Sequence, residues 1–358
     1  MNKLTKVGCS ALCGSLAAIA SANAGALDVT GSSTITWSSN QGDVTGNPIG
    51  MNSGITFAGS GELDSGATYS LTLTGTDKAG YSGGSVVMDT FMGQFRLGHA
   101  DGASGIDAFD DKMPTAWEET WGTSLGTGVD LISGVGASTN VQYKTPSWGN
   151  TYLAVAWAPQ NGGGTANDKA TVGQANGYKQ GGYDVMLNLG LGGDGILGGL
   201  NIFVGGSETD RDDNQASSND TEGKHEEVVV GATFAYGPVT VGAQTTGEFT
   251  GNQVQSEVEY YHNTTWGVTF NVNDDLSLSY AELRSKKGFV GKSHSGDNNT
   301  GTVWINDRVD MDVESMQLAY SMGGASVKIA QTDMSGQNYT SGSTQDKEAT
   351  TVALSLAF

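Results

Sequence analysis

Short stretches in which apolar and polar residues alternate run through almost the whole chain. In LDVTGSSTITW, Leu27, Ile35 and Trp37 share one parity, while threonine, serine and aspartate take the other. Such a period of two predicts a β-strand with one apolar and one polar face. The predicted strands number sixteen: 27–38, 51–63, 67–76, 84–90, 93–99, 138–145, 151–159, 182–190, 199–206, 226–236, 238–248, 256–272, 276–284, 311–322, 325–332 and 347–358.

The connections between these strands alternate in length. Short Gly-, Asn- and Asp-rich turns, such as 64–66, 273–275 and 323–324, suit tight hairpins. Long polar stretches separate them: 39–47, 77–83, 100–137, 160–181, 207–225, 249–255, 285–310 and 333–346. Short turns at one end and long loops at the other are typical of an outer-membrane barrel.

A membrane location also explains the alternation itself. After residue 24 no run approaches the roughly 20 apolar residues that a spanning helix needs. Sheet edges are not tolerated in hydrocarbon, and closing sixteen strands removes them around a lumen wide enough to hold water. We therefore predict an all-β fold, a sixteen-stranded antiparallel transmembrane β-barrel over residues 25–358. The alternative is a soluble β-sandwich, which would need more than 37% apolar residues and more than one domain.

The first 24 residues have the pattern of a secretory signal peptide. Lys3 and Lys6 precede a short apolar segment over 7–20, and Ala22-Asn23-Ala24 is a cleavage site of the A-x-A type. The segment is too short to span a membrane. We therefore expect an exported protein.

Charge and motifs exclude several functions. The first 24 residues hold two lysines, both cysteines and no acid, so the rest carries 15 basic and 38 acidic side chains and no disulfide. Nucleic-acid binding needs clustered Lys and Arg and is not expected. The four histidines, at 99, 225, 262 and 294, are scattered, and no hydrolase, zinc-protease or P-loop motif occurs. We predict neither an enzyme nor a cofactor.

Aromatic residues lie near the predicted strand ends, where they would form girdles at the two membrane interfaces. They are Trp37, Trp148, Tyr152, Trp157, Tyr236, Trp266, Tyr280, Tyr320 and Phe358.

The chain ends on an alternating strand, TTVALSLAF, whose last residue is aromatic. With its leader, strand number, loop alternation and long third loop, the chain resembles the Gram-negative general porins, particularly the alphaproteobacterial type. The resemblance implies a homotrimer in the bacterial outer membrane, surrounded by lipid and lipopolysaccharide, whose third loop folds inward to narrow each pore. It also implies that the assembly machinery recognises the terminal signal, which is Val352, Leu354, Leu356 and Phe358.

The third loop, over 100–137, is rich in acids. The predicted constriction acids are Asp101, Asp107, Asp110, Asp111, Glu118 and Glu119, and Lys112 is the one opposing cation among them. A pore selects by its radius and by the sign of the charge that lines it, so these acids favour cations. The alternative is a solvated surface loop. Within the loop, MPTAWEETW gives a local helix signal, with Pro114 suited to the first helical position.

By resemblance, basic residues on the barrel wall oppose the loop acids. At lumen parity the sequence offers Arg96, Lys144 and Lys328, and it has no basic residue in the first three strands. Lys144 also lies near a short turn, which places it alternatively at the periplasmic rim.

We expect passive diffusion of small hydrophilic solutes and ions, with a mild cation preference. The alternatives are a substrate-specific binding channel and a non-conducting structural or adhesive barrel. Divalent cations could bind loosely at acids of the outer loops. These acids are Asp210, Asp212, Asp213, Asp220 and Glu222.

Overall fold

The computed structural model describes residues 27–41, 47–76, 80–99, 101–123, 125–159, 181–192, 196–210, 224–251, 258–289, 308–340 and 346–357. The predicted signal peptide over residues 1–24 and Phe358 lie outside the described residues. So do four of the five outer-loop acids, Asp212, Asp213, Asp220 and Glu222.

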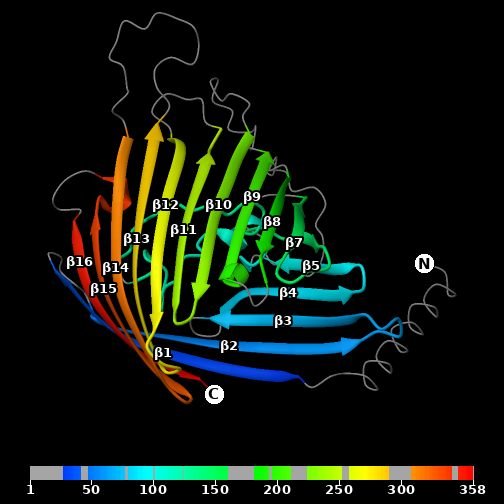
Figure 1. The fold of residues 1–358 in the computed structure, drawn as a ribbon, viewed down its shortest axis with the longest axis horizontal. Helices are drawn as coiled ribbons and strands as arrows, with labels where there is room; N and C mark the ends of the chain where they lie inside the picture. Colours follow the sequence, from blue (N-terminus) through cyan, green and yellow to red (C-terminus); the bar gives the residue numbers. More distant parts are fainter. Residues whose placement is uncertain are drawn as a thin grey trace, which may run out of the picture.

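Sixteen strands form one closed antiparallel barrel, in which each strand pairs with its neighbours in sequence and β1 pairs with β16 (Figure 1). The predicted fold class is confirmed, and each predicted strand is present. The strands are β1 (Asp28–Gln41), β2 (Ile49–Glu62), β3 (Thr68–Thr76), β4 (Gly80–Thr90), β5 (Gly93–His99), β6 (Asn140–Lys144), β7 (Tyr152–Ala158), β8 (Gly182–Gly190), β9 (Leu200–Asp210), β10 (Lys224–Tyr236), β11 (Val239–Phe249), β12 (Val258–Asn271), β13 (Leu276–Phe289), β14 (Arg308–Met322), β15 (Ala325–Ser335) and β16 (Lys347–Ala357).

The seam between the two ends of the chain is in continuous register. Trp37 of β1 pairs with Val352 of β16, and this register continues to Ser32 and Ala357. Leu354 and Leu356 are about 40% exposed on the outer face, whereas Ala353, next to Leu354, is buried. The terminal strand therefore closes the barrel with its alternation intact.

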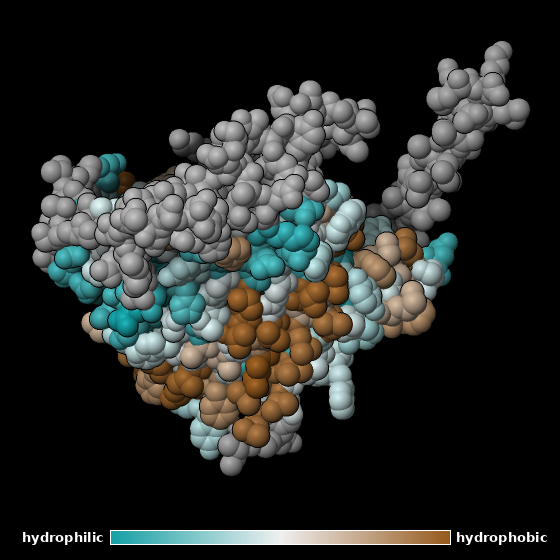
Figure 2. Space-filling model, turned by 90° about the horizontal axis from the view of Figure 1, so that it is seen from above, coloured by the Kyte–Doolittle hydropathy of each residue, from teal (hydrophilic) through white to brown (hydrophobic). Residues whose placement is uncertain are grey.

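The outer wall is an apolar band. Figure 2 shows hydrophobic side chains gathered below a more polar zone on the visible face. Of the predicted girdle residues, Trp37, Trp157 and Tyr236 are exposed on this wall. Tyr152 is an exception, because it shares the parity of buried Ala154 and packs inside the barrel. Its prediction as a girdle residue is wrong, since β7 begins at Tyr152 with the aromatic ring on the inner face.

The loop between β5 and β6, which we call the inner loop (residues 101–139), lies along the inner wall (Figure 1). It begins with a short 3₁₀ helix, η1 (Gly105–Phe109). Its Ile106, Phe109 and Met113 pack against inward-facing Phe203 and Val229. Apolar side chains therefore occupy part of the inner face, which alternation alone assigns to water.

The local helix signal in the inner loop does not become a helix. Residues 113–121 contain only bends and turns. The backbone N–H of Ala116 donates to Ser279 at 2.8 Å, and that of Trp117 donates to Gln317 at 2.9 Å. Because the wall satisfies these donors, a helical turn would gain nothing from them. Two further 3₁₀ segments are η2 (Ile196–Gly199) and η3 (Gln337–Tyr339).

Among the described residues, no helix is both long and apolar enough to cross a membrane.

Candidate pore constriction

The base of the inner loop is clamped by one buried carboxylate. Asp184 of β8 is fully buried, and its Oδ2 accepts hydrogen bonds from the backbone N–H of Ile106 at 2.8 Å and of Val135 at 3.1 Å. These two donors lie at the beginning and the end of the loop. Bonds from N–H groups to a carboxylate are stronger than those between neutral groups, so Asp184 holds both ends of the loop against the wall.

A second carboxylate, on β10, holds the returning half of the loop. Glu227 is 5% exposed, and its two oxygens accept the backbone N–H of Ser133 at 2.9 Å and of Gly134 at 2.6 Å. Gly134 has φ = +49°, and a Cβ there would lie 2.4 Å from Oδ2 of Asp184. Both the backbone angle and the close approach require glycine at this position.

Wall amides hold the middle of the loop, residues 109–119, which we call the bend. Gln244 of β11 donates to the carbonyl oxygens of Phe109 and Asp110 at 2.9 and 2.6 Å, and accepts from the N–H of Lys112 at 3.1 Å. Gln317 of β14 accepts from Glu118 at 3.1 Å and donates to its carbonyl at 2.8 Å. Each amide uses its donor and its acceptor on backbone groups, so the path of the loop is fixed at both places.

The returning half of the loop is anchored on a third side of the barrel. Asn263 of β12 donates to the carbonyl of Asp130 at 2.9 Å, and the Tyr339 hydroxyl accepts from the N–H of Asp130 at 3.0 Å. Leu125 of the loop packs with Leu283 and other inward residues of β12 to β16. The inner loop therefore contacts the wall from β8 round to β15, where Thr123 bonds Thr332.

The predicted constriction acids lie along this path. Glu119 is exposed, and the five others are partly exposed: Asp101, Asp107, Asp110, Asp111 and Glu118. Asp110 and Asp111 turn back to their own segment, with Asp110 accepting from the N–H of Asp111 at 2.6 Å and Asp111 from that of Met113 at 2.8 Å. Asp107 lies beside the base of the loop, near Gly102 and Gly136.

Burial next to other acids makes several of these carboxyls hard to ionise. Burial, with the nearby Asp110 and Glu227, raises the pKa of Asp107 to about 7. Burial raises the pKa of Asp111 to about 6, and it also raises the pKa values of Asp110 and Glu118. Near neutral pH the charge of the loop therefore depends on pH.

The three predicted wall cations have different surroundings. Arg96 of β5 forms an ion pair with Asp101, and both side chains are largely buried, at 16% and 14% exposed. Lys328 of β15 lies over the ring of Trp117, 5.8 Å from Nζ to the centroid, and its charge lowers the pKa of Glu118 against the larger effect of burial. Lys144 lies over the Tyr152 ring at 5.2 Å, where β6 ends. Two of the three thus lie beside loop acids.

Several loop anchors were not identified from the sequence. Asp184 and Glu227 each stand at inward parity two residues before a buried apolar residue, Met186 and Val229 respectively, in GYDVMLNLG and KHEEVVVGATFAY. An acid in that setting is a usable signal, because a buried carboxylate requires donors. Gln244, Gln317 and Asn263 carry no comparable signal, since polar residues at inward positions are common in this chain.

Comparison with known proteins agrees with this architecture. The family model for Gram-negative porins matches residues 8–355. No curated protein matches the sequence significantly.

Several solved structures share the fold at low sequence identity. The trimer form of OmpT from Vibrio cholerae is 12% identical with a TM-score of 0.62, covering 93% of this chain and 99% of that one. OmpF from Salmonella typhi, in complex with daunomycin, is 12% identical with a TM-score of 0.60, covering 93% and 97%. OprB from Pseudomonas putida is 10% identical with a TM-score of 0.55, covering 96% of both chains. The family match over nearly the whole chain, with the closed sixteen-stranded barrel, places this protein in the bacterial outer membrane as a member of the Gram-negative porin family.

Proposed function

We propose that this porin is a passive channel for small hydrophilic solutes and ions, and that the acids of its inner loop give it a mild cation preference. The observation that carries the proposal is the attachment of the inner loop to inward-facing side chains from β8 to β15. This attachment keeps the acids of the loop inside the barrel. Barrels of this strand number leave an aqueous lumen, and the charge that lines a narrow passage sets its ion preference.

The charge of the inner loop supports cation preference. Between residues 110 and 119, the acids Asp110, Asp111, Glu118 and Glu119 outnumber the single Lys112. Arg96 is paired with Asp101, which leaves Lys328 as the wall cation beside the bend. Acids therefore exceed bases along this part of the path, and the resulting potential attracts cations.

Removing part of the bend of the inner loop tests the channel function. Deletion of residues 114–119 takes away Glu118 and Glu119 and the contacts to Gln317. Single-channel conductance of the purified protein in planar bilayers should rise, because the passage widens. An unchanged conductance would place the constriction elsewhere, and a wild-type protein that folds but passes no current would favour a structural or adhesive barrel.

The alternative of a substrate-specific channel predicts a different result. Current through a binding channel is blocked in a saturable way by its own solute, whereas a diffusion channel shows rates that depend on solute size. Liposome swelling with sugars and amino acids of increasing mass distinguishes the two. The prediction that the protein is not an enzyme rests on its family and on the absence of a catalytic motif from its sequence.

The partners belong to the same proposal. A homotrimer is supported by the trimer form of the structurally similar OmpT and by large apolar side chains exposed on the outer face of β1 to β5, among them Met51, Phe57 and Leu73. The apolar band would contact lipid and lipopolysaccharide. Val352, Leu354 and Leu356, with Phe358, would be the signal for the assembly machinery; cross-linking of outer-membrane complexes in cells tests these contacts.

A further inference from the structure

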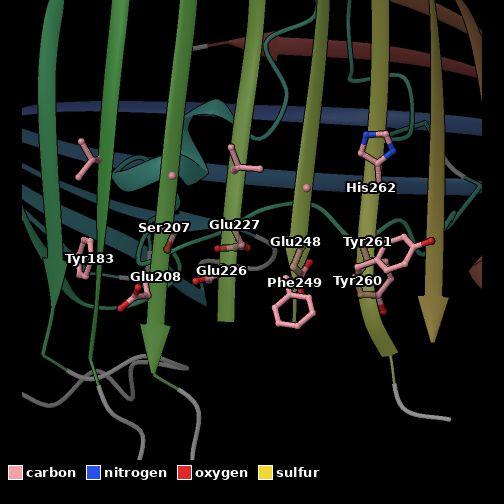
Figure 3. A pocket seen from close by; sticks show the side chains of 14 residues that line it. Tyr183, Ser207, Glu208, Glu226, Glu227, Glu248, Phe249, Tyr260, Tyr261 and His262 are labelled. Carbon is pink, nitrogen blue, oxygen red and sulfur yellow. The ribbon is translucent and has the colours of Figure 1, made fainter. Parts of the chain in front are cut away.

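Three potential metal ligands converge on the inner face, at the ends of β10 and β11. The ligand atoms of His225, Glu227 and Glu248 all lie within 4.8 Å of one another. His225 Nε2 is 3.0 Å from Oε1 of Glu248. Figure 3 shows Glu227 and Glu248 on adjacent strands, where both line a pocket together with Tyr261 of β12. None of these residues belongs to the predicted constriction.

The strand register brings two acids of this cluster face to face. Glu227 of β10 is directly opposite Glu248 of β11. Like charges in directly opposed positions destabilise a sheet. On the same face, Asp130 of the inner loop adds a third carboxylate that interacts electrostatically with both Glu248 and His225. The nearby Nζ of Lys287 lies over the rings of Tyr261 and Tyr339, at 5.5 and 5.4 Å.

The cluster is held in place before any ion binds. Both oxygens of Glu227 accept backbone N–H groups of the inner loop, at Ser133 and Gly134. Each carboxylate oxygen has a second lone pair, so these bonds orient Glu227 without using up its capacity as a ligand. The side chains of His225 and Glu248 are 27% and 11% exposed, so an ion can reach them from solution.

We propose that His225, Glu227 and Glu248 form a binding site for a divalent ion of the zinc class, with water as the fourth ligand. Zinc binds imidazole nitrogen at about 2.0–2.1 Å and carboxylate oxygen at about 2.0–2.2 Å, usually in a tetrahedron. Ligand atoms in such a tetrahedron are about 3.4 Å apart, close to the His225–Glu248 distance. Calcium and magnesium prefer oxygen ligands alone, so the imidazole selects against them.

A bound ion would connect the barrel wall to the inner loop. It would neutralise the opposed carboxylates. Because Glu227 also accepts the backbone N–H groups of Ser133 and Gly134, this side chain would link the ion to the inner loop. Binding requires a deprotonated imidazole, so the affinity for zinc should fall in acid.

Equilibrium binding of zinc to the folded, tag-free porin in detergent tests the site. Titration calorimetry with zinc chloride should show one ion per subunit, and His225→Gln and Glu248→Gln should each weaken binding at least about tenfold. Zinc-edge X-ray absorption should show one imidazole ligand in the wild type and none in His225→Gln. The measurement involves no current, so it stands apart from the test of channel function.

The matched control is His262→Gln, since His262 is an exposed histidine on the outer face of the neighbouring β12. It should bind zinc as the wild type does. Wild-type affinity in His225→Gln, equal losses in His262→Gln, or calcium binding as tight as that of zinc would each overturn the proposal. Heat-dependent migration on gels confirms that each variant is folded, so that a loss of zinc binding reports on the site.

Discussion

At the scale of single residues, two buried carboxylates determine where the inner loop lies. Asp184 and Glu227 are the charged acceptors. The loop donates four backbone N–H groups to them, at Ile106, Ser133, Gly134 and Val135. Both acids lie on barrel strands. The wall therefore determines the position of the long inner loop. The position of the loop therefore depends on a few named bonds.

Replacing Asp184 with asparagine should release the base of the loop. The amide side chain offers one acceptor oxygen and presents an NH₂ group where the carboxylate accepted a hydrogen bond. The loss of charge-assisted bonds should cost about 1.5–3 kcal/mol per bond. Hydrogen exchange should rise at residues 105–107 and 133–136 while the strands stay protected. The control is Asp333→Asn, on the outer face of β15; equal exchange in the two variants would contradict this role of Asp184.

Gly134 should not tolerate alanine. Its φ of +49° is unfavourable for any side chain, and the new Cβ would clash with Asp184 and with Cγ1 of Ile106 at 2.7 Å. We expect faster proteolysis of the loop in Gly134→Ala. Gly237→Ala is the matched control, because Gly237 has φ = +56° and open space around its Cβ position. If both variants resist protease equally, the clash has no role in holding the loop.

At the scale of elements, the strands were predictable and the inner loop was predictable only in part. Alternation identified each strand, because one face meets lipid and the other meets the lumen. Several strands were predicted too short at the end that meets a long loop: β13 reaches Phe289, whereas the predicted strand ends at 284. Lys286 and Lys287 interrupt the alternation there, but backbone pairing continues regardless of side-chain polarity.

The inner loop shows why local signals fail in this barrel. The helix signal at Pro114 is overridden because wall residues accept the N–H groups of Ala116 and Trp117. Anchors such as Asp184 and Thr332 lie on strands, 49 and 209 residues along the chain from the loop residues that they hold. A single sequence contains no direct record of such pairings.

The inner loop should make ion selectivity depend on pH. The pKa of Asp107 is raised to about 7 and that of Asp111 to about 6, so both carboxyls lose charge as the pH falls from 8 to 5. Cation preference, measured as the permeability ratio of potassium to chloride, should decrease over this range. The raised pKa values also favour the loop held against the wall as the pH falls. In that state Asp107 and Asp111 keep protons that the same aspartates in a free loop, with ordinary pKa values near 4, have already released.

The Asp107→Asn variant should have a weaker dependence on pH between 6 and 8. It retains Asp111, so the part of the change near pH 6 should persist. An unchanged permeability ratio across the whole range in the wild type would show that these acids do not affect the permeating ions.

The two faces of a strand should respond differently to charge. Ile329 of β15 is 39% exposed on the outer wall and pairs with Val352, whereas the adjacent Lys328 faces inward. Arginine on the lipid side of a barrel costs about 2–4 kcal/mol at the middle of the bilayer. Ile329→Arg should lower the free energy of unfolding in urea by up to this amount, while Lys328→Gln should change it little. Similar losses in both variants would contradict the assignment of the faces.

At the scale of the whole molecule, the barrel is a rigid ring that presents a charged loop to its own lumen. The closed order from β1 to β16 leaves no free sheet edge among the described strands. The apolar band holds the barrel in the membrane. The hydrogen bonds between the wall and the inner loop keep the acids of the loop in fixed positions inside the barrel. Selectivity is therefore proposed to come from the loop, and the barrel supplies its fixed frame.

The most direct test of this account is the zero-current potential across a planar bilayer with a potassium chloride gradient at pH 8. Low salt, at about 0.1 M, keeps the screening length near 10 Å, so the loop charges act on passing ions. The wild type should give a potential of the sign set by potassium, and the Asp107→Asn/Asp111→Asn/Glu118→Gln/Glu119→Gln variant should move it toward zero. A potential of the sign set by chloride, or the same potential in both proteins, would contradict the account.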